Sequence, residues 1–181
     1  MNLNVDNILI IGLGMIGSSI ALATKSKGIK VYGFDKSNDC TNEALEKNII
    51  DSKVESIEDM SLKDFVKKVE LIIVAVPPKQ TLDFLNNLKN IWNTDVTITD
   101  TSSVKNHIKL TDVSNIVLSH PIAGSDQSGI SAATGDLFKN KKNVLCDPFK
   151  SKKGHFEKVD NFWKNALQMK TALMTVSEHD L

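Results

Sequence analysis

Arginine is absent from this chain of 181 residues, and all 22 of its basic residues are lysine. Acidic residues also number 22, so the formal net charge is zero and gives no indication of a nucleic-acid or anionic membrane partner. Cysteine is scarce: Cys40 and Cys146 form no metal-binding or redox motif, which favours a reduced, cytoplasmic setting. No apolar run is long enough to cross a bilayer, and we expect no targeting segment.

The most informative motif covers residues 8–17, ILIIGLGMIG. An apolar run ends at a glycine, the glycines follow as G-x-G-x-x-G, and apolar residues then continue at helical spacing. This order predicts a strand, a tight turn and a helix whose N-terminus can bind a pyrophosphate. The alternative is a strand–helix turn with no ligand. The residues expected at a dinucleotide are Gly12, Gly14, Met15, Ile16 and Gly17.

Asp35 follows the next predicted strand, residues 30–34. An acidic residue at this distance from the glycines is expected to accept hydrogen bonds from the ribose hydroxyls of NAD and to repel the extra phosphate of NADP. We therefore predict NAD as the cofactor, with NADP less favoured. Lys36 weakens this prediction slightly, and the alternative is an ordinary loop aspartate.

The rest of the chain alternates between strand and helix patterns. Residues 71–76 form a continuous apolar run, typical of a strand buried on both faces, and Val76 and Pro77 lie where it reaches the ligand-binding edge. We predict an α/β fold: a Rossmann-like, doubly wound, mostly parallel sheet with helices on both faces. Further strands are expected at 96–99, 115–118, 143–146 and 170–176, and helices at 42–47, 61–69, 80–92 and 151–169, after 100–105, and from 177.

Two polar side chains are candidates for chemistry because each follows a predicted strand. His120 has the side chain whose pKa suits a general base near neutral pH, and Ser103 can hydrogen-bond an imidazole or a substrate. The alternatives are a loop histidine and a helix N-cap. The other histidines, at 107, 155 and 179, have no metal-binding spacing, so we expect them to be structural or at the surface, with no metal site.

Four strings taken together resemble the prephenate dehydrogenase family, which includes arogenate and cyclohexadienyl dehydrogenases. They are GLGMIGS at 12–18, VPP at 76–78, DTSSVK at 100–105 and SHPIAGS at 119–125, and the resemblance extends to His179 and Asp180. It implies oxidative decarboxylation of prephenate to 4-hydroxyphenylpyruvate with reduction of NAD. It also implies that His120 takes a proton from the substrate hydroxyl. Ser103 would then orient both His120 and that hydroxyl.

The resemblance also implies a substrate site that includes Gly124, Ser125 and Asp126, the last as a gating residue. Family members continue into a helical domain that dimerises and supplies an arginine for a substrate carboxylate. We therefore expect residues 1–176 to be the NAD-binding domain and residues 177–181 to begin the connection to a helical domain absent from this sequence. A homodimer is expected for the full-length enzyme, and poor turnover by this chain alone.

Three other functions are compatible with the sequence. The substrate could be arogenate, because the residues that distinguish it from prephenate are expected to lie beyond Leu181. A β-hydroxyacid dehydrogenase or imine reductase would share the nucleotide-binding architecture but would not use His120. A non-catalytic NAD-binding module would bind nucleotide without turnover.

Overall fold

The computed structural model describes residues 5–57, 67–92, 94–124 and 127–181. Most of the helix expected at 61–69 lies outside these residues, as do Ser125 and Asp126. Within the described residues no helix is both long and apolar enough to cross a membrane.

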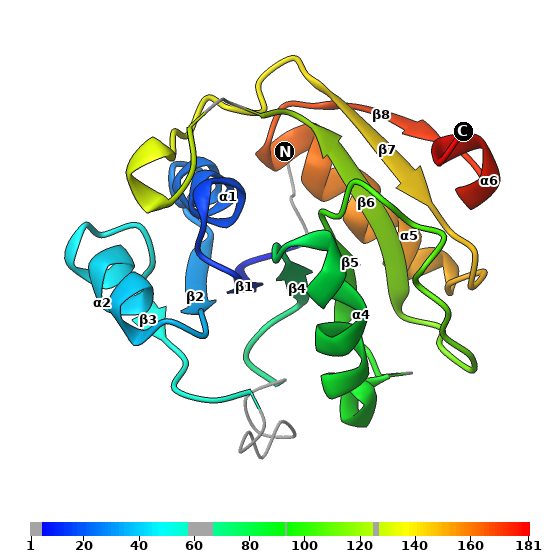
Figure 1. The fold of residues 1–181 in the computed structure, drawn as a ribbon, viewed down its shortest axis with the longest axis horizontal. Coiled ribbons are helices and arrows are strands. Elements are labelled where there is room, and N and C mark those ends of the chain that lie inside the picture. Colours follow the sequence, from blue (N-terminus) through cyan, green and yellow to red (C-terminus); the bar gives the residue numbers. More distant parts are fainter. Residues whose placement is uncertain (1–4, 58–66, 93, 125–126) are drawn as a thin grey trace.

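An eight-stranded sheet forms the centre of the described residues, in the order β3-β2-β1-β4-β5-β6-β7-β8 (Figure 1). All neighbours pair in parallel except β6 and β7, which are antiparallel. The mostly parallel sheet predicted from the sequence is therefore confirmed. The strands are β1 (Asn7–Ile11), β2 (Lys30–Phe34), β3 (Ser52–Lys53), β4 (Leu71–Val74), β5 (Thr97–Asp100), β6 (Ile116–Ile122), β7 (Lys142–Cys146) and β8 (Lys170–Leu173).

Helices cover both faces of this sheet. On one face, α1 and α5 pack with the π-helical turn η3 around a core that includes Ile20, Phe162 and Trp163. On the other face, α4 contributes Phe84 and Leu85 to a second core. The helices are α1 (Met15–Lys25), α2 (Asn38–Glu46), α4 (Pro78–Asn87), α5 (Lys153–Asn161) and α6 (Val176–His179), with short turns η1 (Lys89–Ile91), η2 (Ile130–Ala132) and η3 (Phe162–Ala166).

The central strands are apolar along their length because both of their faces are covered. In β1, Ile8 and Ile10 belong to the core beneath α1, whereas Leu9 and Ile11 belong to the core beneath α4. All four side chains are fully buried. This two-sided burial is the reason for the unbroken hydrophobic runs of β1 and β4.

The helix expected after residues 100–105 is not present, and this prediction is wrong. Residues 101–110 form turns and irregular structure. The backbone N–H groups of Lys105 and Asn106 donate to the carboxylate of Asp180, far away in the sequence. The buried ammonium of Lys105 also bonds Asp100 and the carbonyl of Ser119, and these tertiary contacts hold the segment in a non-helical path.

β6 is longer than the strand predicted at 115–118 and contains His120, which the sequence pattern placed in a loop. The extension pairs with β7, where His120 lies opposite Val144 and Pro121 opposite Asn143. β5 pairs with β6 only at Ile116 and Val117, so beyond Val117 that edge of β6 has no strand beside it. Proline is tolerated in a strand with an open edge.

Other element boundaries differ by a few residues. The helix predicted at 42–47 begins at Asn38, where the Ser37 hydroxyl accepts the N–H of Cys40 and caps it. The helix predicted at 80–92 begins at Pro78, because proline fits the first helical turn, and ends at Asn87 before η1. The helix predicted at 151–169 is divided into α5 and η3, and the last strand ends at Leu173.

Candidate active site

The glycine turn joins β1 to α1 at the carboxyl edge of the sheet. Gly12 has φ +95°, and a Cβ there would lie 2.5 Å from the carbonyl oxygen of Ala75. A Cβ on Gly17 would collide with the carbonyl oxygen of Gly12. A Cβ on Gly14 would have no heavy atom within 4 Å. Gly12 and Gly17 are therefore needed for the turn itself, whereas Gly14 leaves space into which a ligand can approach the backbone.

The first turn of α1 is suited to an anion. Gly14 is the N-cap, so no side chain caps the helix, and its first turn contains no acidic residue. The first N–H groups of a helix have no partner within it, and they carry a partial positive charge. Met15 and Ile16 belong to this turn, as expected for a site that binds a pyrophosphate.

Asp35 connects the turn to the end of β2. Its carboxylate accepts the N–H of Leu13 at 2.7 Å and the N–H of Ser37 at 2.9 Å. Each carboxylate oxygen has a further lone pair, so ribose hydroxyls can still bind. A cavity of about 340 Å³ opens beside it, lined by Gly12, Gly14, Phe34, Asp35, Val76 and Pro77 among others.

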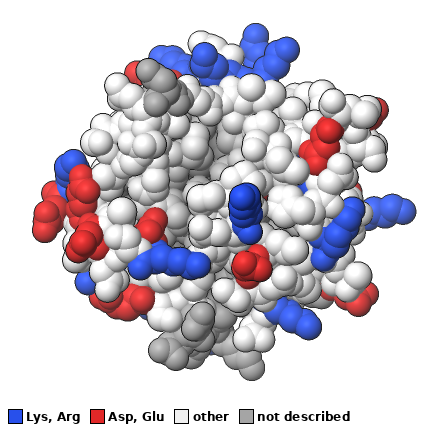
Figure 2. Space-filling view, in the orientation of Figure 1, with Lys and Arg blue, Asp and Glu red and all other residues white. Residues whose placement is uncertain are grey.

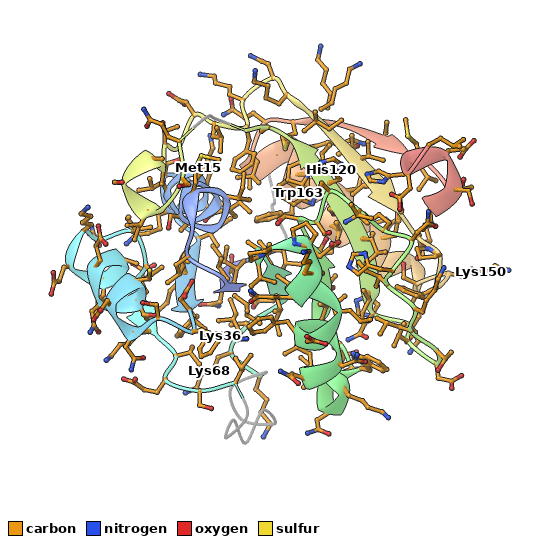
Figure 3. The ribbon with its side chains drawn as sticks, viewed as in Figure 1. Met15, Lys36, Lys68, His120, Lys150 and Trp163 are labelled. Carbon is orange, nitrogen blue, oxygen red and sulfur yellow. The ribbon has the colours of Figure 1, made fainter. Side chains whose placement is uncertain are left out.

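A second cavity of about 420 Å³ adjoins the first, and both are lined by Gly14, Val76 and Pro77. Met15 approaches from α1 and His120 from β6 (Figure 3). The face that contains the carboxyl edge is hollowed, and the walls of the hollow carry mainly uncharged residues (Figure 2). Residues from four separate segments therefore meet here: Met15, Ile16, Val76, Pro77, Ser103 and His120 all line this cavity.

His120 is half-buried on β6, and its Nδ1 lies 2.9 Å from Nε2 of His179. Burial lowers the pKa of His120 below its ordinary value, the ammonium of Lys105 acts in the same direction, and a positive charge on His179 would do so as well. The carboxylates of Asp100 and Asp180 oppose this shift. A lowered pKa keeps the imidazole neutral near pH 7, which is the form able to accept a proton.

Of the two expectations for His179, a structural role or a place at the surface, its burial fits the structural one. Its side chain is 4% exposed, and its Nδ1 lies 2.5 Å from the Asp180 carboxylate. Burial alone would raise the pKa of Asp180, but hydrogen bonds from His179 and from the N–H groups of Asn106 and Lys105 lower it. The only local sequence signal was the Thr175–Glu178 capping box, which starts the helix that carries His179.

A buried ion pair lies beneath the loop that carries Ser103. The ammonium of Lys105 contacts the carboxylate of Asp100 at 2.6 Å, and both side chains are fully buried. The same ammonium donates to the carbonyl of Ser119 at 2.6 Å, and Asp100 accepts the Ser119 N–H at 3.0 Å. Ser119 precedes His120, so the ion pair fixes the strand segment that carries the imidazole. Sequence reasoning gave Lys105 no such role.

Of the remaining candidates, Ser103 is exposed and lines this cavity together with His120. Gly124 is exposed just beyond β6, and a Cβ there would meet no atom within 4 Å. Ser125 and Asp126 lie outside the described residues. No group of three His, Cys, Asp or Glu side chains suited to a metal ion occurs in the part of the chain that the structure describes.

A larger cavity of about 740 Å³ lies elsewhere, between α5, β8 and α6. Its lining is mostly apolar and includes Phe156, Leu173 and Met174. Neither the glycine turn nor His120 contributes to it. We therefore place the active site in the two adjoining cavities at the carboxyl edge.

Comparison with known proteins shows the family to which the chain belongs. The family model for the nucleotide-binding domain of prephenate dehydrogenase matches residues 20–169. Prephenate dehydrogenase of Bacillus subtilis is 35% identical, over 99% of this chain and 49% of that protein. The enzyme of Lactococcus lactis is 38% identical, over 77% of this chain and 40% of that protein. The chain thus spans about half the length of the Bacillus relative.

A solved structure shows the same fold. It is prephenate dehydrogenase from A. aeolicus, in complex with hydroxyphenyl propionate and NAD+. The two chains are 27% identical and superpose with a TM-score of 0.84, over 96% of this chain and 61% of the other.

Proposed function

This chain belongs to the prephenate dehydrogenase family, and on that premise we propose that its site carries out the NAD-dependent oxidative decarboxylation of prephenate to 4-hydroxyphenylpyruvate. The observation that carries the proposal is that the turn suited to a pyrophosphate and the imidazole of His120 border one cavity. A dehydrogenase needs this juxtaposition, because a base must act on the hydroxyl whose carbon loses a hydride.

The residues of the chain have separate roles in this proposal. The turn at Gly12, Gly14 and Gly17 receives the pyrophosphate, and Asp35 receives the adenosine ribose, which favours NAD over NADP. NAD supplies the hydride acceptor when bound. Val76 and Pro77 line both cavities, so a dinucleotide that occupied the two would contact both residues.

His120 acts as the general base. It accepts the proton of the ring hydroxyl, the hydroxyl carbon becomes a ketone as its hydride leaves, and loss of carbon dioxide then makes the ring aromatic. The proton returns to the oxygen as the phenol forms, so no net proton is consumed. Aromatisation provides the driving force, and the protein contributes orientation and one base. Ser103, on the same cavity wall, is placed to hold the substrate hydroxyl.

The test is a single-turnover experiment in which the chain is in excess over prephenate and NAD is at a saturating concentration. We expect NADH and 4-hydroxyphenylpyruvate to form in equal amounts, even if slowly. Absence of either product would contradict the proposal. A parallel panel distinguishes the alternatives: NADH formed faster with arogenate identifies an arogenate-type enzyme, and NADH formed only with β-hydroxy acids identifies the wider dehydrogenase group. A non-catalytic module would bind NAD and form no NADH.

A further inference from the structure

His120, His179 and Asp180 form a continuous hydrogen-bonded relay at the edge of the active-site cavity. His120 Nδ1 lies 2.9 Å from His179 Nε2, and His179 Nδ1 lies 2.5 Å from Asp180 Oδ1. The side chains of His179 and Asp180 are 4% and 7% exposed. They are contributed by α6 and the residue after it, whereas His120 lies on β6.

The carboxylate of Asp180 determines the direction of every hydrogen bond in the relay. Its oxygens also accept the N–H groups of Lys105 and Asn106, at 3.1 Å and 2.7 Å, and these bonds favour its ionised form. An ionised carboxylate only accepts, so Nδ1 of His179 must donate to it. Neutral His179 then presents a bare Nε2, which can only accept the proton on Nδ1 of His120. Nε2 of His120 is left without a proton.

We propose that His179 and Asp180 are positioning residues that hold His120 in the tautomer protonated on Nδ1, so that Nε2 is the atom that accepts a proton. The inference rests on the proposed function in one respect, the role of His120 as the base. In the absence of the relay, neutral histidine prefers the opposite tautomer, with Nε2 protonated and unable to act as a base.

The relay also stabilises His120 after it accepts a proton. The imidazolium keeps its Nδ1–H directed at His179, and the carboxylate at the far end provides the opposite charge. Four charged or titratable groups act on this imidazole: Asp100 at the end of β5, Lys105 in the loop that follows, and His179 and Asp180 at α6. Of the two carboxylates, only that of Asp180 is linked to Nδ1 of His120 through the hydrogen-bonded imidazole of His179.

Asp180→Asn is a sharp test because the surrounding donors fix the orientation of the new amide. Its oxygen must accept the N–H of Asn106, so its NH₂ group faces Nδ1 of His179. That nitrogen then becomes the acceptor, His179 is protonated on Nε2, and its N–H points at Nδ1 of His120. The tautomer of His120 is thereby reversed, and its Nε2 carries the proton. The matched control is Glu178→Gln, which removes an exposed carboxylate from the same helix but keeps a side-chain oxygen that can accept the N–H of Thr175 and maintain the capping box.

The tautomer is measured by long-range ¹H–¹⁵N NMR of the labelled 181-residue chain at alkaline pH, with His120 assigned from the spectrum of His120→Asn. We expect Nδ1 protonation of His120 in the natural chain and in Glu178→Gln, and Nε2 protonation in Asp180→Asn. Nε2 protonation in the natural chain, or no change in a folded Asp180→Asn variant, would overturn the proposal. This readout uses no substrate, so it does not depend on the proposed reaction.

A second variant and a kinetic measurement complete the test. His179→Leu removes the relay but leaves Asp180 bonded to the backbone of the 105–106 segment, and it should also shift His120 toward Nε2 protonation. In single turnover, Asp180→Asn should slow NADH formation by about a hundredfold, the usual contribution of a general base, with NAD affinity unchanged. A natural chain with the expected tautomer but no NADH would refute the proposed function and leave the relay standing.

Discussion

Replacing Gly14 by alanine should weaken NAD binding without unfolding the protein. A Cβ at Gly14 meets no heavy atom within 4 Å, and φ −68° with ψ −168° is open to alanine. Loss of glycine at the N-cap costs a few tenths of a kcal/mol to about 1 kcal/mol, and restriction of the unfolded chain offsets about 0.4–1 kcal/mol. We therefore expect the free energy of unfolding to change by no more than about 0.5 kcal/mol.

The effect on binding should be much larger. The added methyl group projects into the space shared by the two cavities, where the pyrophosphate would approach the backbone. Loss of one hydrogen bond to a charged group costs about 1.5–3 kcal/mol, which corresponds to roughly tenfold to a hundredfold weaker binding. Isothermal titration calorimetry with NAD measures the affinity, and urea denaturation measures the stability.

Two other glycines serve as matched controls. A Cβ on Gly154, in α5, also meets nothing within 4 Å, and this residue lines neither cavity. Gly154→Ala should therefore bind NAD as the natural chain does. Gly17→Ala should instead destabilise the fold, because its Cβ would collide with backbone. If Gly14→Ala bound NAD normally, or unfolded as Gly17→Ala does, the assignment of the turn would be refuted.

Three further predictions concern the ion pair, the cofactor preference and pH. Lys105→Met should lower the free energy of unfolding by about 3–5 kcal/mol in urea denaturation, because Asp100 would be left buried without its counter-charge; adding Asp100→Asn should recover part of the loss, and no recovery would contradict this reason. Asp35→Asn should narrow the preference for NAD over NADP about tenfold in calorimetry, and an unchanged ratio would exclude Asp35 from the selectivity. Burial lowers the pKa of His120 and of His155 below the ordinary 6.5, so as the pH falls the unfolded chain binds protons at a higher pH than the folded chain does. The melting temperature should therefore fall as the pH drops below 6.5. A melting temperature that stayed constant between about pH 7.5 and 5.5 would contradict these shifts.

The glycine turn could be predicted from sequence because its determinants are local. Residues 8–17 specify a buried strand, a turn in which Gly12 takes a positive φ, and a helix, all within one stretch of chain. Asp35 follows β2, which pairs directly with β1, so its place beside the glycine turn could also be predicted from a short stretch of sequence. The structure brings these residues together as the sequence indicated.

The surroundings of His120 depend on contacts between distant residues. Its place inside β6 follows from antiparallel pairing with β7, and Pro121 made a strand look improbable there. Its relay partner His179 is 59 positions away and follows β8, which pairs with β7. No periodicity shows that Lys105 is buried, because its burial requires Asp100 and the carbonyl of Ser119 in place. The candidate base could be named from the sequence, but His179, Asp180 and Lys105, which surround it in the structure, could not.

The most direct test of the proposed function compares His120→Asn with the natural chain in a single turnover of prephenate at saturating NAD. The account predicts a rate of NADH formation lower by about a hundredfold or more, with NAD affinity measured on the same samples unchanged. A variant that formed NADH at the natural rate would show that His120 is not the base and would contradict the account.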